Sequence, residues 1–314
     1  MEKVINLGIP HIGEQMLENI DTDELIKCLK VSETWKILAE NVLLKRWNGR
    51  IFEACESGKA EIVKLLLERV ENNNLNAIQT SGKFEGTAFG VACKNGHNEV
   101  IQLLLDLKKD KNVEFDARNR DGYTTFRAFG HKDVVQLILD HAIDRNIRLN
   151  VKDENEGTPF MLACQNEHKN IVQLFLKYSV DRNIDMNARD NDGWTALMLA
   201  CSYGQKDVVK MLLGHLEQNI DLNARRNDGS TAFMWACYFG HKDVVKLFLD
   251  NSERIELNAR TTFEMTALMM ACSNGHKDVV QLLLDHSERI DLNVRDNYGD
   301  TAFTWACRNG HKDV

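Results

Sequence analysis

The sequence predicts an all-α fold: a solenoid of helix-turn-helix units with hairpin-like finger loops, preceded by a small trihelical unit. The first observation is a unit of roughly 35 residues that recurs along most of the chain. The second is that each copy has an apolar stripe that it cannot bury alone, so that neighbouring copies must stack. The third is that residues 1–49 lack this unit and have a helical pattern of their own.

The repeat is marked by a threonine, then a small residue or proline, then usually Phe or Leu. Copies aligned on this threonine follow one another at intervals of 34 to 37 residues, and a degenerate earlier copy covers residues 50–77. We therefore expect about eight copies within residues 50–314. The aligned threonines are Thr87, Thr124, Thr158, Thr195, Thr231, Thr266 and Thr301.

Each part of the unit has a physical role. An Asp-Gly pair turns the finger, and the threonine oxygen caps the first helix. A small Ala-Cys pair lets that helix pack closely against its neighbours, and a glycine in the left-handed conformation ends it. The second helix starts with an acidic first turn and buries an apolar face. A representative copy, residues 191–225, reads NDGWTALMLACSYGQKDVVKMLLGHLEQNIDLNAR.

This unit resembles the ankyrin repeat over residues 50–314, and the resemblance implies a surface for binding proteins. One departure is that only Thr158-Pro159 keeps the family's Thr-Pro pair. Another is that the histidine expected after Thr-Pro-Leu is absent, which removes the usual source of its hydrogen bonds. The residues in its place are Met198, Met234, Met269 and Thr304.

Two copies depart further from the pattern. The copy at Thr124 is three residues shorter between its threonine and its Gly-His pair, so irregular packing is expected around Arg127, Ala128 and Phe129. The last copy stops at Val314, before its second helix. We read the chain as cut short or as ending in a frayed repeat.

Composition favours protein partners. The net charge of -8 leaves no broad basic surface for nucleic acid or an anionic membrane. The N-terminus has no signal-peptide pattern, and no apolar run is long enough to span a membrane. We expect an intracellular protein, in the cytoplasm or nucleus, without a cofactor.

The cysteines and histidines predict packing and not metal chemistry. Seven of the eight cysteines follow alanine in the first helix, the position of a small buried residue in a reducing compartment. Cys-x-x-x-His pairs do recur, but a single repeated pair does not supply the four ligands of zinc, and Gln205 and Lys59 replace the histidine in two copies. Cys28, outside the repeats, is expected in the core. The seven are Cys55, Cys93, Cys164, Cys201, Cys237, Cys272 and Cys307.

Residues 9–47 predict three short helices. Ile12, Met16 and Ile20 share one face, Asp21 or Thr22 caps a second helix, and Ser32 caps a third. The segment resembles an F-box, with Ile9-Pro10 near its start and Val31-Ser32-x-x-Trp35 near its end. The resemblance implies docking on the Skp-type adaptor of a cullin-RING ubiquitin ligase. The adaptor-binding residues that it implies are Ile9, Pro10, Ile12, Leu17, Leu25, Val31 and Trp35. Alternatively, the three helices only cap the solenoid.

The target-binding surface is predicted on the first helices. The fifth, eighth and ninth positions of each copy, counted from the threonine, should point away from the Ala-Cys packing pair. Aromatic side chains gather there, as they do in binding hot spots, although such rings also cover neighbouring helices. An arginine row in the fingers either forms a positive surface or pairs with nearby aspartates. The candidate partner-binding residues are Trp194, Tyr203, Trp235, Tyr238, Phe239 and Trp305.

The sequence thus favours a non-catalytic receptor, in which residues 1–49 bind the ligase adaptor and residues 50–314 hold an unidentified target. The alternative is an interaction scaffold without a ligase. An enzyme is disfavoured, because no paired carboxylates, nucleophile arrangement or phosphate-binding glycine loop occurs outside the repeat pattern.

Overall fold

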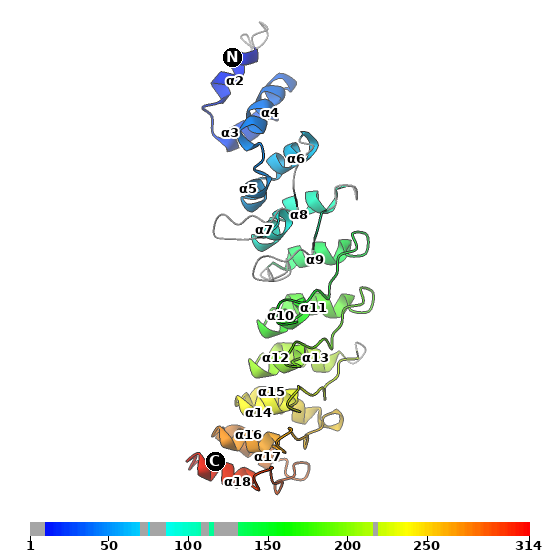
Figure 1. Cartoon of the computed structure of the whole chain (residues 1–314), viewed down its shortest axis with the longest axis vertical. Helices are drawn as coiled ribbons and strands as arrows, with labels where there is room; N and C mark the ends of the chain where they lie inside the picture. Colours follow the sequence, from blue (N-terminus) through cyan, green and yellow to red (C-terminus); the bar gives the residue numbers. More distant parts are fainter. Residues whose placement is uncertain (1–9, 70–74, 76–85, 108–112, 116–130, 216–218) are drawn as a thin grey trace. The chain divides into compact units, whose positions relative to one another are not determined.

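The computed structural model forms two compact units, Met1–Ile147 and Arg148–Val314. Every secondary-structure element of the described residues is a helix (Figure 1), which agrees with the predicted all-helical solenoid. Among the same residues, no helix is both long enough and apolar enough to cross a membrane. The structure describes residues 10–69 (side chains from residue 14), 75, 86–107, 113–115, 131–215 and 219–314.

The N-terminal unit begins with three helices whose caps follow the predicted pattern. Asp21 Oδ1 accepts hydrogen bonds from the backbone amides of Asp23 and Glu24, both at 2.9 Å, and so caps the second helix in preference to Thr22. Ser32 Oγ accepts one from the Trp35 amide at 3.4 Å. The third helix, 15 residues long, is longer than expected. The helices are α2 (Pro10–Leu17), α3 (Thr22–Cys28) and α4 (Glu33–Trp47).

The core of these helices continues into the repeats of the same unit. Leu17, Leu25 and Leu43 are fully buried, and α2 and α3 both pack on α4. Helix α4 also packs against α6, so the N-terminal helices cover the first repeat. The remaining described helices of this unit are α5 (Ile51–Glu56), α6 (Ala60–Arg69), α7 (Ala88–Lys94), α8 (Asn98–Leu105) and α9 (Lys132–His141). The shortened copy around Arg127 lies outside the described residues.

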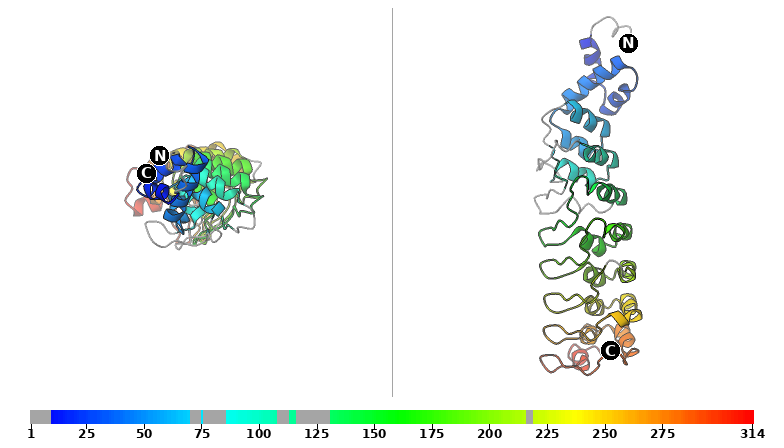
Figure 2. Two further views of the ribbon diagram at one scale, coloured as in Figure 1. Left: turned by 90° about the horizontal axis from the view of Figure 1, so that it is seen from above. Right: turned by 90° about the vertical axis from the view of Figure 1, so that its right-hand side faces the viewer.

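The C-terminal unit is a regular stack of helix pairs. First helices pack on first helices from α10 to α18, and second helices pack on second helices from α11 to α17. In this unit the finger loops project to one side of the helices (Figure 2). Its helices are α10 (Pro159–Gln165), α11 (Lys169–Tyr178), α12 (Ala196–Ser202), α13 (Lys206–Gly214), α14 (Ala232–Tyr238), α15 (Lys242–Asp250), η4 (Ser252–Arg254), α16 (Ala267–Ser273), α17 (Lys277–Leu284) and α18 (Ala302–Arg308).

Six of the seven predicted threonine caps are present, and the seventh, at Thr124, lies outside the described residues. Thr231 Oγ1, for example, accepts from the Met234 amide at 3.4 Å. Two copies also replace the missing histidine: Thr304 Oγ1 accepts from the Thr301 amide at 2.6 Å, and the Met269 sulfur lies 3.5 Å from the Thr266 nitrogen. The other capping threonines are Thr87, Thr158, Thr195, Thr266 and Thr301.

In several copies, the residue after the helix-ending glycine links neighbouring repeats. His241 Nε2 lies 3.0 Å from the Ser202 carbonyl oxygen of the preceding copy, and His276 Nε2 lies 2.8 Å from that of Tyr238. Gln205 keeps this link, because its Nε2 donates to the Gln165 carbonyl at 2.9 Å. These side chains therefore have structural partners. Within the described residues, no group of three or more His, Cys, Asp or Glu side chains could hold a metal ion.

An asparagine near the end of four copies forms a second link between repeats. Asn223 Nδ2 donates to the Arg254 carbonyl at 2.9 Å, and Asn223 Oδ1 accepts from the Glu256 amide at 2.8 Å. One side chain thus satisfies two backbone groups of the following copy. The same pair of bonds is made by Asn150, Asn187 and Asn258.

The cysteines follow the packing prediction with two corrections. Six of the seven cysteines that follow alanine are buried. Burial raises the pKa of Cys55 to about 12 and that of Cys272 to about 11. Cys307, in α18, is exposed. Cys28 is half-buried and not part of the core.

Candidate functional site

An aromatic cluster forms where two first helices lie side by side. Trp194 lies in the finger just before α12, and Tyr203 follows the last residue of that helix. Trp235 and Tyr238 belong to α14, and Phe239 follows its last residue. Because α12 packs directly on α14, the finger of one copy meets the helix of the next. The repeat spacing therefore brings together side chains that are up to 45 positions apart in the sequence.

The rings contact one another around Trp235. Its ring centroid lies 4.7 Å from that of Trp194 and 5.9 Å from that of Phe239, with interplanar angles of 34° and 26°. Tyr238 meets both Trp235 and Phe239 edge to face, at 5.3 and 4.9 Å. Such contacts stabilise a pair by roughly 0.5–1.5 kcal/mol beyond simple burial, so the cluster is held in place before any partner binds.

These rings line a groove of about 960 Å³. Tyr203 is 56% exposed, Phe239 45% and Tyr238 36%, whereas Trp194 and Trp235 are half-buried. We call this feature the aromatic groove. Its remaining walls come from α10 and from the two preceding fingers. Five of the six predicted partner-binding residues thus lie on one concave surface.

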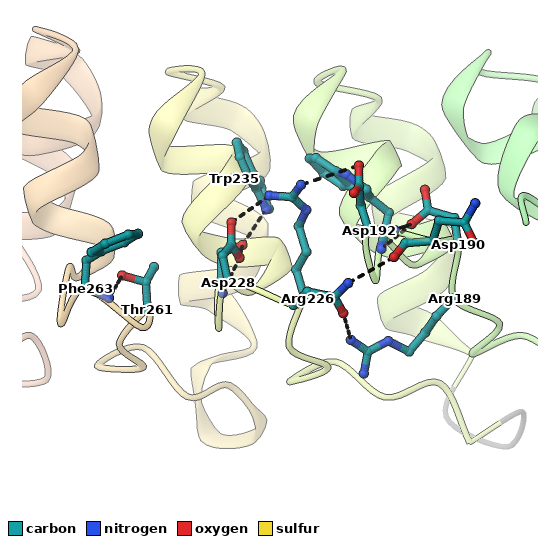
Figure 3. Close-up of polar contacts among 12 residues, drawn as sticks. Arg189, Asp190, Asp192, Arg226, Asp228, Trp235, Thr261 and Phe263 are labelled. Atoms are coloured by element: carbon teal, nitrogen blue, oxygen red, sulfur yellow. Dashed lines mark hydrogen bonds and ion pairs between the residues drawn. The ribbon is translucent and has the colours of Figure 1, made fainter. Parts of the chain in front are cut away.

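Arg226 supports the groove from the finger between α13 and α14. Its guanidinium carbon lies 5.0 Å from the centroid of Trp194 and 5.6 Å from that of Trp235. The same side chain pairs with Asp228 at 2.6 Å and with Asp192 at 3.6 Å (Figure 3). One cation thus joins two fingers and two indole rings.

The sequence analysis missed Arg226, although the sequence contains a signal for it. Aligned copies have Asp153, Asp190 or Asp296 at this position, and the aspartate oxygen accepts backbone amides of the finger turn. In the copy with Arg226, Asp228 is instead the acceptor in the finger turn, since it accepts a hydrogen bond from the Ser230 amide at 3.0 Å. A charge reversal at one copy of a repeated position was the signal.

Two carboxylates of the neighbouring fingers, Asp190 and Asp228, have opposite pKa shifts. Burial raises the pKa of Asp190, although hydrogen bonds from the amides of Trp194 and Asp192 oppose this effect. Burial also acts to raise the pKa of Asp228, but hydrogen bonds from Ser230 and the charge of Arg226 outweigh it, so the pKa falls. Folding therefore favours the ionised form of Asp228, whereas it disfavours the ionised form of Asp190.

We expect Asp228→Asn to lower the stability of the C-terminal unit at pH 7 and Asp190→Asn to leave it unchanged or raise it. A lowered folded-state pKa gives stability above the unfolded pKa that is lost as pH falls through the folded value. The deficit of Asp228→Asn should therefore shrink below about pH 4. For Asp190, with its raised pKa, the carboxylate opposes folding at neutral pH, and Asn still accepts the two backbone amides. Urea unfolding between pH 3 and 7 measures both, and equal effects of the two changes would contradict this account.

Trp305 does not join the cluster. Its Nε1 donates to Asp296 Oδ2 at 2.8 Å, and the Arg308 guanidinium carbon lies 5.4 Å from its ring centroid. It does not line the aromatic groove. Met270, which holds the same fifth position in its copy, is 8% exposed and is covered by neighbouring helices, contrary to the expectation that this position points away from the packing pair.

In the described fingers, the arginine row does not pair with the neighbouring aspartates Asp192, Asp228 and Asp296. Arg225 pairs with Glu256, and Arg260 with Glu264, each at 2.9 Å. Arg295 donates to the Gly299 carbonyl at 2.7 Å. Arg189 donates to Asn227 Oδ1 at 3.3 Å. Arg118 and Asp121 lie outside the described residues.

The residues implied for adaptor binding have different environments. Val31 is 62% exposed and Trp35 is half-buried, so both present surface. Leu17 and Leu25 are fully buried and pack the three helices against one another. Pro10 and Ile12 lie in α2, and Ile9 is outside the described residues.

Comparison with known families agrees with the repeat geometry. The family model of ankyrin repeats, built on three copies, matches residues 51–148, 128–226, 185–260 and 233–314. No F-box family model matches the N-terminal residues. Comparison with curated proteins gives no match.

Proposed function

Because the chain belongs to the ankyrin-repeat family, we propose that it is a non-catalytic protein-binding adaptor that holds its target protein in the aromatic groove. We propose further that residues 1–49 bind a Skp-type adaptor of a cullin-RING ubiquitin ligase, which makes the chain a substrate receptor. Its action is then enforced proximity: tethering a target beside the ligase raises the effective concentration of the target without chemistry in this chain.

The observation that carries the target-binding proposal is the preformed aromatic cluster. A surface that exposes Tyr203, Tyr238 and Phe239 together keeps apolar area in contact with water, and such area is recovered when a partner covers it. The half-buried Trp235 holds the rings of Tyr238 and Phe239 in position, so a partner has little ordering to impose there. These are properties of a binding hot spot.

The test is a comparison of captured proteins by quantitative mass spectrometry. The bait is the full chain, the chain with Tyr203→Ala and Phe239→Ala, or the chain with Phe263→Ala. Phe263 is the matched control, since it is 54% exposed but lies in a finger away from the groove. The amount of captured target should fall by about tenfold or more only with the bait that carries Tyr203→Ala and Phe239→Ala. Equal capture by all three baits in folded protein would overturn the groove as the target site.

Support for adaptor binding comes from the exposed surface of the N-terminal helices. Val31 and Ile37 are 62% and 56% exposed, and Met16 is 46% exposed, although neighbouring apolar residues are packed inside. The packing of α4 on α6 also suits the alternative, a plain scaffold in which these helices only cap the repeats. The two functions differ in whether the exposed side chains bind a partner.

A pull-down with a purified Skp-type adaptor separates the two. Val31→Glu tests the predicted contact, and Val180→Glu is the control, because Val180 is 74% exposed in the repeats. Capture by the intact chain and by Val180→Glu, with loss in Val31→Glu, would support the ligase receptor. Failure of the intact chain to bind the adaptor would leave an ankyrin-repeat scaffold with a helical cap.

A further inference from the structure

The charges of the aromatic groove are of one sign. Its lining includes Asp153, Asp190 and Asp192 but no lysine, arginine or histidine. Asp192 is well exposed, with 71% of its side-chain surface accessible. Arg226 lies beside the groove and is already paired with two aspartates. The groove therefore combines electron-rich ring faces with an excess of negative charge.

Two of these carboxylates have unused acceptor capacity. Asp153 is 7% exposed, and its Oδ1 accepts from the amides of Asn155 and Gly157 at 2.9 and 2.8 Å. Asp190 Oδ1 likewise accepts from Asp192 and Trp194. Among the described residues, no donor reaches Oδ2 of either aspartate. Neither Oδ2 is enclosed by the protein, so a donor on a bound ligand can reach both oxygens and make a charge-assisted hydrogen bond.

The protein's own Arg226 shows which donor suits this surface. Its guanidinium packs against both indole rings and pairs with carboxylates at the same time. A guanidinium is planar, stacks on aromatic faces and donates in a fork that matches a carboxylate, whereas an ammonium is a compact and strongly hydrated charge. The rings and aspartates that face the groove offer the same chemistry.

We propose that the aromatic groove recognises an arginine side chain in a basic segment of the target protein. The basic segment lies along the groove over Tyr203 and Phe239, and its guanidinium donates to the free oxygen of Asp153 or of Asp190. This inference rests on the proposed function, because it assumes that the groove is where the target binds. It adds the chemistry of the segment that is bound.

Charge complementarity selects this occupant over two others. An acidic segment would bring carboxylates toward three aspartates and be repelled. An apolar helix would cover the rings, but it would leave Asp153 buried without a donor, and an unsatisfied buried charge opposes binding. A basic segment satisfies both the rings and the carboxylates.

The test begins with a displayed library of random ten-residue peptides selected on the full chain. Enriched peptides should share an arginine. The strongest of them is then synthesised with arginine, with lysine, and with citrulline, which keeps the shape of arginine but has no charge. By fluorescence anisotropy, the arginine peptide should bind at least about tenfold more tightly than the citrulline peptide, and more tightly than the lysine peptide.

The double variant Asp153→Asn with Asp190→Asn tests the assigned carboxylates. Each Asn keeps the Oδ1 acceptor of its finger turn but loses the charge. The preference for arginine over citrulline should shrink severalfold in this variant. Asp296→Asn is the matched control, since Asp296 Oδ1 accepts the same finger amides outside the groove. That control should keep the full preference, and circular dichroism confirms that each variant is folded.

The outcomes separate the inference from the proposed function. Enriched peptides without arginine that lose binding in Tyr203→Ala with Phe239→Ala would overturn the arginine site and leave the groove as the docking surface. Equal binding of arginine and citrulline peptides would do the same. If no peptide is enriched, or if the enriched peptides ignore the groove variant, both the arginine site and the groove as the target site fail.

Discussion

Gly204→Ala is expected to lower the free energy of unfolding of the C-terminal unit by about 2–4 kcal/mol. Gly204 ends α12 with a φ of +69°, a conformation that side chains with a Cβ rarely adopt. A Cβ built there would lie 2.6 Å from Nδ1 and 2.8 Å from Cε1 of His241. That ring cannot simply move away, because its Nε2 is hydrogen-bonded to the Ser202 carbonyl of the preceding copy. Backbone strain and a broken link between repeats therefore add together.

The matched control is Gly214→Ala in the same repeat. Gly214 is the last residue of α13, its backbone is helical, and a Cβ there would meet no atom within 4 Å. Alanine is the better helix former, so this change should be neutral or raise stability by up to about 1 kcal/mol. Urea unfolding followed by circular dichroism compares the two. A Gly204→Ala protein as stable as Gly214→Ala would refute the packing of glycine against histidine as a structural requirement.

Asn223→Ala is expected to lower the same free energy by about 1–3 kcal/mol. The substitution removes two hydrogen bonds to the next copy, one to the Arg254 carbonyl and one from the Glu256 amide. Both backbone groups lie near the surface, where water replaces part of the lost bonding. The loss should therefore fall below the cost of leaving two fully buried groups unsatisfied.

Asn293 provides the control for this prediction. It holds the same place in the copy that begins at Thr266, but within the described residues its side chain makes no hydrogen bond to another repeat. Asn293→Ala should therefore change the urea midpoint little. If both alanine variants lose the same stability, the effect belongs to the local loop and not to the link between repeats.

Links of these two kinds matter for function because they fix the register of α12 and α14. Gly204 and His241 hold the ends of these helices together, and Asn187 holds the loop before α14 through Asp221. The aromatic groove is made by side chains from both copies, so its shape depends on that register. A variant that loosens either link should bind groove ligands more weakly in proportion to the loss of stability.

Much of this protein could be read from the sequence. The recurring threonine predicted the caps, the glycine before each histidine predicted the left-handed helix end, and the Ala-Cys pair predicted a packed first helix. These features are local, because they depend on backbone conformation and on side-chain volume, and the repeat reports each of them several times. The family model and the helical structure agree with them.

Only part of the aromatic site could be predicted from the sequence. The exposed positions were predicted by counting along the repeat, and five of six aromatic residues lie in one groove. Trp305 was grouped with them by type, but its indole is bonded to Asp296 within its own copy. The role of Arg226 was not predicted, because its partners Asp192 and Trp194 come from another finger. F-box-like residues such as Leu25 were inferred from a pattern that cannot distinguish a buried from an exposed leucine.

The sequence by itself determined the solenoid, its period, its caps and the small residues between stacked helices, since all of these follow from local conformation repeated at a fixed spacing. Only the tertiary structure decided which side chains of different copies contact one another. The groove with its unpaired carboxylate oxygens, the asparagine and histidine links, and the arginine packed on two indole rings all join residues from different repeats. Their geometry depends on how one repeat is rotated and offset against the next, which is set by packing across the interface and not by either repeat alone.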